Sequence, residues 1–127
     1  MLRSDRMVLV VEDDPDSCDL LARFLKRFGF DVRSAANAVE ALAVLKSAPI
    51  SVAIVDYHLP DHDGLWLLRE MNDDPDLAGV STVMFSGAFE HDVARRAFAE
   101  GAKEWLVKGV HSPSRVVETV ERLHGPK

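Results

Sequence analysis

The stretch AIVDYHLPDHDG, residues 53–64, ends a strand-like apolar run in a carboxylate. Three apolar residues, 53–55, lead directly into Asp56, and a loop with Pro60 and Gly64 follows before a helical pattern begins. A short apolar run of this kind is consistent with a strand buried on both faces of a sheet. The position of Asp56 at the end of that strand raises the question of what chemistry this acid performs.

Polar residues directly follow three further strand-like runs: Glu12 and Asp13, Ser86, and Lys108. In open α/β sheets, ligands bind beyond the carboxyl ends of the strands. We therefore expect the three carboxylates, the hydroxyl and the ammonium to gather at one edge of a sheet.

Such a cluster is suited to phosphoryl transfer. Three neighbouring carboxylates repel and raise one another's pKa, and a divalent cation relieves that repulsion. Oxygen ligands favour a hard ion such as Mg²⁺, which binds one or two carboxylates together with a phosphate. Lys108 would add a second positive charge for an incoming anion, Ser86 would hydrogen-bond one of its oxygens, and Asp56 would be the nucleophile.

The elements that must position these residues alternate between strand and helix along the chain. The predicted strands are 7–11, 30–34, 51–55, 81–85 and 104–107, and the helices that follow begin near residues 14, 37, 64, 91 and 112. Asp14, Asn37 and Ser112 are the predicted helix N-caps, and Asp14 is interpreted as a cap in preference to a metal ligand. Five such units predict an α/β fold with a mostly parallel sheet and helices on both faces.

Composition places the chain among globular domains. The 127 residues fit one domain, 1–127 with a core of about 7–124, and 47% of them are apolar. The net charge of −6 argues against direct binding to nucleic acid or to an anionic membrane. The apolar run 7–11 is too short for a signal peptide or a membrane span, so a cytoplasmic location is expected. The one cysteine, Cys18, excludes an internal disulfide and is expected to pack in the interior.

The chain resembles the response-regulator receiver domains of two-component signalling. The matching pieces are VVEDD at 10–14, DYHLPDHDG at 56–64, SG at 86–87 and Lys108, in that order and at fitting intervals over nearly the whole chain. The resemblance implies a doubly wound, flavodoxin-like (βα)5 fold with strand order 2-1-3-4-5. It also implies a stand-alone phosphoacceptor, comparable to a chemotaxis regulator, whose partner is a sensor histidine kinase or a histidine phosphotransfer protein.

The resemblance also assigns roles to individual positions. Asp56 would accept the phosphoryl group, and Ser86 and Lys108 would contact it. Mg²⁺ would be bound by Asp13 and Asp56 directly, by Glu12 through water, and by the backbone carbonyl of His58. Trp105 stands where the family usually has Tyr or Phe, and it would report phosphorylation by changing rotamer; simple core packing is the alternative. The chain would catalyse only its own phosphorylation and dephosphorylation, as a monomer or weak dimer.

One departure from the family lies after Lys108, where Gly109 replaces the usual proline. A cis bond before glycine costs about 2.5–4 kcal/mol, so a trans bond is expected here. Gly109 is expected to adopt φ > 0, Lys108 to point into the acidic cluster, and the loop 109–112 to be more mobile.

Two other functions remain open from the sequence. An unphosphorylated interaction module with a receiver fold would carry the same residues. A small phosphatase with an Asp nucleophile would also use Mg²⁺, a hydroxyl and a lysine. That class needs a second acid two residues after the nucleophile, where this chain has His58.

Overall fold

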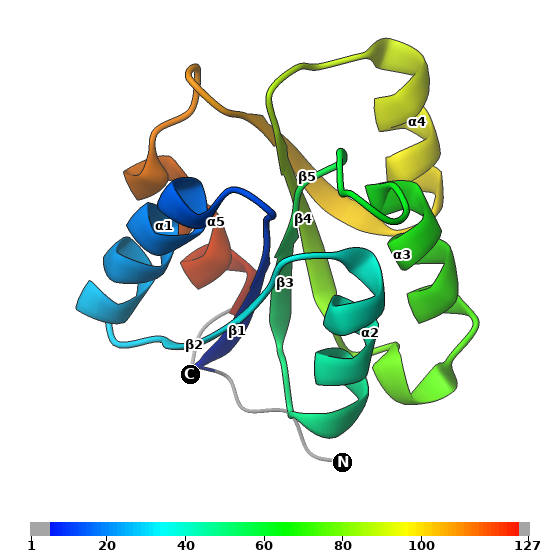
Figure 1. Ribbon diagram of the computed structural model, residues 1–127, viewed down its shortest axis with the longest axis horizontal. Helices are drawn as coiled ribbons and strands as arrows, with labels where there is room; N and C mark the ends of the chain where they lie inside the picture. The colour runs from blue at the N-terminus through cyan, green and yellow to red at the C-terminus, as the bar shows by residue number, and fades with distance from the viewer. Residues whose placement is uncertain (1–5, 125–127) are drawn as a thin grey trace.

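Five parallel strands form one sheet in the order β2-β1-β3-β4-β5, as the resemblance implies (Figure 1). The computed structural model describes residues 6–124, so residues 1–5 and 125–127 of the predicted domain lie outside the described residues. The elements are β1 (Met7–Val11), α1 (Pro15–Arg27), β2 (Asp31–Ala35), α2 (Ala38–Ser47), β3 (Val52–Val55), α3 (Gly64–Asn72), a 3₁₀ turn η1 (Pro75–Leu77), β4 (Ser81–Ser86), α4 (His91–Ala99), β5 (Ala102–Val107) and α5 (Pro113–His124). The predicted fold class is confirmed.

Helices cover both faces of the sheet, with α1 and α5 on one face and α2, α3 and α4 on the other (Figure 1). Every residue of β1 and β3 is buried, which explains why these strands read as continuous apolar runs. Alternate residues of β1 face opposite layers: Val8 and Val10 pack in the cluster under α1 and α5, and Leu9 and Val11 in the other. Cys18 is half-buried against the α1/α5 cluster, as predicted.

The register of the sheet brings the strand ends together. Val11 pairs with Val55, and Val55 pairs with Met84. Glu12 directly follows β1 and Asp56 directly follows β3, so the two residues lie side by side at this edge of the sheet. Because the strands are parallel, the ends of β4 and β5 lie at the same edge.

The three predicted N-caps are confirmed. Asp14 accepts a hydrogen bond from the Ser17 amide, and Asn37 and Ser112 do the same at the starts of α2 and α5. α2 has a second cap that the sequence did not reveal. The Asp61 carboxylate, from the β3–α3 loop, accepts the Ala38 and Val39 amides at 2.9 Å each. Asp61 and Ala38 are 23 residues apart along the chain, so no local sequence signal indicates this contact.

Several element boundaries differ from the prediction. β2 begins one residue later than predicted, and β5 begins at Ala102, two residues earlier, because Ala102 pairs with Thr82 before a register shift in the β4–β5 ladder. α4 ends at Ala99, and Gly101 completes its C-terminal turn at φ +102°. η1 was not predicted; Asp74 caps it and Pro75 begins it.

Gly64 allows α3 to begin close beside the Asp56 strand end. A Cβ atom at this position would lie 3.0 Å from the Asp56 carbonyl oxygen and 2.7 Å from the Met84 methyl carbon. The Gly64 amide donates to the Tyr57 carbonyl at 2.8 Å, which closes the β3–α3 loop. Within residues 6–124, no helix combines the length and apolar character that a membrane crossing requires.

Candidate functional site

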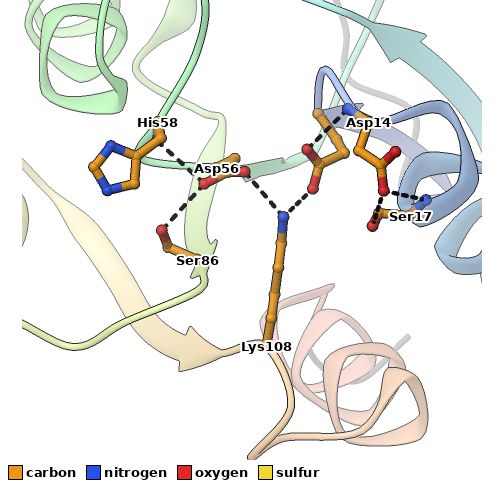
Figure 2. A network of polar contacts seen from close by, with 7 residues as sticks. Asp14, Ser17, Asp56, His58, Ser86 and Lys108 are labelled. Atoms are coloured by element: carbon orange, nitrogen blue, oxygen red, sulfur yellow. Dashed lines mark hydrogen bonds and ion pairs between the residues drawn. The ribbon is translucent and has the colours of Figure 1, made fainter.

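The Asp56 carboxylate lies at the centre of the sheet edge and is bound from three sides (Figure 2). It is 8% exposed. Oδ1 accepts the Ser86 hydroxyl and the His58 amide, both at 3.1 Å, and Oδ2 accepts the Lys108 ammonium at 2.9 Å. These bonds come from β4, the β3–α3 loop and the end of β5, so three separate segments fix the orientation of one carboxylate.

Lys108 also forms an ion pair with Glu12, so its ammonium bridges the two buried acids of the site. Burial raises the pKa of Glu12, although the hydrogen bonds from Lys108 and from the Asp14 amide oppose the effect. Burial alone would lower the pKa of Lys108, but its bonds to Glu12 and Asp56 outweigh that effect and raise the pKa above the ordinary value. The lysine therefore carries its charge throughout the neutral pH range.

The residues present fit a divalent cation. Glu12, Asp13 and Asp56 each offer a carboxylate oxygen, and the three oxygens lie within 4.8 Å of one another. Lys108 compensates only part of their negative charge. Asp13 is exposed, so its carboxylate can bind an ion that retains several waters. All of the donors are hard oxygens, the set that Mg²⁺ prefers.

The structure thus brings together the predicted site residues Glu12, Asp13, Asp56, Ser86 and Lys108. His58 contributes its backbone amide to the site, while its exposed ring lies edge-on to Tyr57, with the ring centroids 4.9 Å apart. In Figure 2 this ring points away from Lys108. The pairing of Lys108 with Glu12 could not be predicted, because the sequence pattern locates the ends of the strands and not the direction of the side chains there.

Trp105 is buried beneath the loop that joins β4 to α4. Its side chain is 8% exposed, and its indole N–H donates to the Ala88 carbonyl at 3.1 Å. Its ring centroid lies 6.1 Å from those of Tyr57 and Phe89. Trp105 therefore contacts both the loop after Asp56 and the loop after Ser86.

The turn after Lys108 has the predicted backbone. Gly109 has φ +83°, and residues 6–124 contain no cis peptide bond. Lys108 points into the acidic cluster, as predicted. His111 lies in a polar segment, which predicts a surface position, but the residue is half-buried, and its Nδ1 accepts the Val107 amide at 2.9 Å. The greater mobility of loop 109–112 stays a prediction, and this hydrogen bond joins the loop to the end of β5.

Comparison with known protein families identifies the sequence pattern. Residues 8–121 match the family described as the response regulator receiver domain. The response regulator protein PilR of Pseudomonas aeruginosa is 32% identical over 126 residues, which cover 98% of this chain and 28% of that protein. The transcriptional regulatory protein GltR of the same species is 30% identical over 97% of this chain and 50% of its own length. The chain therefore spans half or less of these curated relatives.

Solved structures show the same fold. A CheY-like receiver domain protein from Methanospirillum hungatei superposes with a TM-score of 0.85 at 27% identity, over 97% of this chain and 94% of that one. A response regulator described as putative, from Chloroflexus aurantiacus, gives a TM-score of 0.87 at 26% identity, over 95% and 98% of the two chains. The arrangement of buried acids, hydroxyl and lysine therefore lies on a scaffold that many signalling proteins share.

Proposed function

This chain belongs to the family of response regulator receiver domains, and on that premise we propose that Asp56 is its phosphoacceptor. Receiver domains of this family act in two-component signalling, where histidine kinases phosphorylate them. The observation that carries the assignment is the carboxylate of Asp56, buried at the end of β3 and bound by Ser86, Lys108 and the His58 amide. Among the three acids of the cluster, Asp56 has the most donors around it.

The transfer reaction follows from these contacts. One carboxylate oxygen of Asp56 forms a bond to phosphorus, and the bond from phosphorus to the leaving atom of the donor breaks. The electron pair departs with that leaving group, which is the imidazole of a phosphohistidine or the acetate of acetyl phosphate. The Lys108 ammonium and the Ser86 hydroxyl already contact the carboxylate, so they can turn to the phosphoryl oxygens as negative charge moves onto them.

The same residues would hold a metal ion. Asp13 and Asp56 would bind Mg²⁺ directly, with Glu12 acting through water and the His58 backbone carbonyl completing the protein ligands. The ion would neutralise charge on the phosphoryl oxygens during transfer. The support for this assignment is the excess of negative charge around Lys108 and the mutual approach of the three carboxylate oxygens.

We further propose that the acyl phosphate is read out through Ser86 and Trp105. A phosphoryl group on Asp56 would draw the Ser86 hydroxyl toward it and would move the loop that follows β4. The Ala88 carbonyl in that loop accepts the Trp105 indole, so the movement would change the environment of Trp105. The output is a changed protein contact or onward transfer of the phosphoryl group, and the donor is a sensor histidine kinase or a phosphotransfer protein.

Labelling with acetyl phosphate and Mg²⁺ tests the proposal. Intact-mass analysis should show wild-type protein gaining one phosphoryl group, and the Asp56→Asn variant should gain none. Addition of EDTA should prevent labelling of the wild type. Equal labelling of Asp56→Asn would place the acceptor elsewhere, and an unlabelled wild type would favour an unphosphorylated interaction module.

A further inference from the structure

Two hydrogen bonds join Val107 and His111 across the turn that carries Lys108. The His111 amide donates to the Val107 carbonyl at 2.8 Å, and the Val107 amide donates back to the His111 imidazole at 2.9 Å. A third bond, from the Val110 amide to the Val107 carbonyl, closes the same turn at 3.2 Å. Residues 108–110 therefore lie between Val107 and His111, each of which donates a hydrogen bond to the other.

The position of the Val107 amide explains why a side chain is needed there. The Lys108 amide donates to Ser86 in β4, and neighbouring amides along a strand point to opposite sides. The Val107 amide consequently faces away from β4. Among residues 6–124, β5 is the last strand of the sheet, and no backbone carbonyl of a further strand meets this amide. The imidazole of His111 provides the acceptor that a neighbouring strand would otherwise supply.

The residue between them makes this support important for Lys108. Gly109 has no side chain and adopts φ +83°, and among the described residues only Gly109 itself and its two chain neighbours come within 4 Å of where a Cβ would lie. A glycine in this position leaves the backbone beside Lys108 with more freedom than any other residue would. The His111 bonds restrict that freedom immediately next to the lysine.

From these contacts we infer that His111 is a positioning residue for Lys108. Its imidazole accepts the Val107 amide, fixes the end of β5, and so keeps the Lys108 ammonium aimed at Asp56 and Glu12. The neutral form with the proton on Nε2 is the form that can accept this bond. The half-buried His111 also lines a cavity of about 180 Å³, which Lys108 and Gly109 line as well. The inference rests on the proposed role of Asp56 as phosphoacceptor.

A matched pair of substitutions tests the inference. In His111→Asn, Oδ1 stands the same number of bonds from the backbone as Nδ1 and can accept the Val107 amide. His111→Leu has nearly the shape of the Asn variant but no acceptor. The initial rate of Asp56 labelling by acetyl phosphate should fall roughly 5–10-fold in the Leu variant and stay within about 2-fold of wild type in the Asn variant, since a displaced ammonium loses alignment and keeps its charge. Hydrogen exchange of the Val107 amide should be slow in wild type and Asn and fast in Leu.

A double-variant experiment separates positioning from a general effect on folding. If His111 acts through Lys108, His111→Leu should not slow labelling further when Lys108 is already alanine. A further slowing there, or equal rates in the Leu and Asn variants, would overturn the inference. Should the Leu variant fail to fold, His111→Gln, whose acceptor lies one bond too far out, takes its place. Unlabelled wild-type protein would instead refute the proposed function, so the two failures are distinguishable.

Discussion

The β4–α4 and β5–α5 loops, which flank the site, differ in how firmly hydrogen bonds hold them. Residues 108–112, after β5, are tied by the reciprocal Val107–His111 bonds, and Ser112 caps the helix that follows. Residues 87–90, after β4, are all exposed, and Glu90 makes no side-chain cap bond at the start of α4. Within the described residues, the side-chain hydrogen bond to this loop comes from Trp105, whose indole N–H donates to the Ala88 carbonyl.

On the assignment proposed above, this difference separates two tasks. Lys108 stands beside the more firmly held β5–α5 loop, where an accurate position would help its ammonium to stabilise developing charge. Ser86 leads into the less firmly held β4–α4 loop, through which a pull on its hydroxyl would reach Ala88 and Trp105.

Lys108→Ala should have the largest effect because it removes the group that the fixed loop holds in place. Labelling of Asp56 by acetyl phosphate should slow by about 100-fold, comparable to the loss of one charge-stabilising donor in other active sites. Lys103→Ala removes an exposed cation from β5, the strand that precedes Lys108, and should leave the rate unchanged. Initial rates from intact-mass analysis test this, and a similar loss in both variants would show that Lys108 acts only through net charge.

Asp13→Ala should weaken Mg²⁺ binding by about 10-fold while leaving both loops intact, because it removes one of the two carboxylates proposed to bind the ion directly. The free energy of unfolding without Mg²⁺ should be equal to or higher than that of wild type, since like charges are relieved. A fluorescence titration with Mg²⁺ gives the affinity, with Asp16→Ala, an exposed acid of α1, as the control. Unchanged affinity in Asp13→Ala would remove Asp13 from the metal site.

Trp105→Phe tests the hydrogen bond that joins the Trp105 indole to the β4–α4 loop. A smaller aromatic ring takes the place of the indole and the N–H bond to Ala88 is lost, so the free energy of unfolding should fall by at least about 1 kcal/mol in urea denaturation. In the wild-type protein, the indole N–H resonance of Trp105 should shift on phosphorylation. Trp66, the other tryptophan, lies on α3 and provides the internal control. A shift confined to Trp66 would contradict the assigned route.

Glu90→Ser should have the smallest effect and would make the two loops more alike. Glu90 has the extended backbone of an N-cap, with φ −118° and ψ 121°, but its side chain makes no cap bond. A serine there should add roughly 0.5–1 kcal/mol of stability and raise the Tm by about 2–4 °C. Glu121→Ser, on the exposed side of α5, removes the same charge without offering a cap and should not raise the Tm. An equal rise in both variants would attribute the gain to charge alone.

The parts of the structure that could be predicted are those that depend on periodicity. Strand ends of a parallel sheet meet at one edge, so Glu12, Asp56, Ser86 and Lys108 could be grouped from their sequence positions. The three helix caps could be predicted because each depends on residues within one turn.

The features that escaped prediction depend on the direction of a side chain or on distant contacts. His111 resembles an exposed loop residue, and only the open edge of β5 reveals which amide it accepts. Lys108 was expected to bind an incoming anion, yet in the folded chain its ammonium forms ion pairs with Glu12 and Asp56. Neither fact follows from hydrophobic patterning, since both depend on where a strand sits in the finished sheet.

The second cap of α2 gives the chain a measurable response to acid. Burial raises the pKa of Asp61, but the amides of Ala38, Val39 and His62 together outweigh this effect and lower the pKa to about 2. In the unfolded chain, an aspartate takes up its proton near pH 3.9. The contribution of Asp61 to stability is therefore complete above about pH 4 and is lost as the pH falls toward 2. Solvent screens so exposed a group, so in an acid titration this step should be a small one, and Asp61→Asn should lack it.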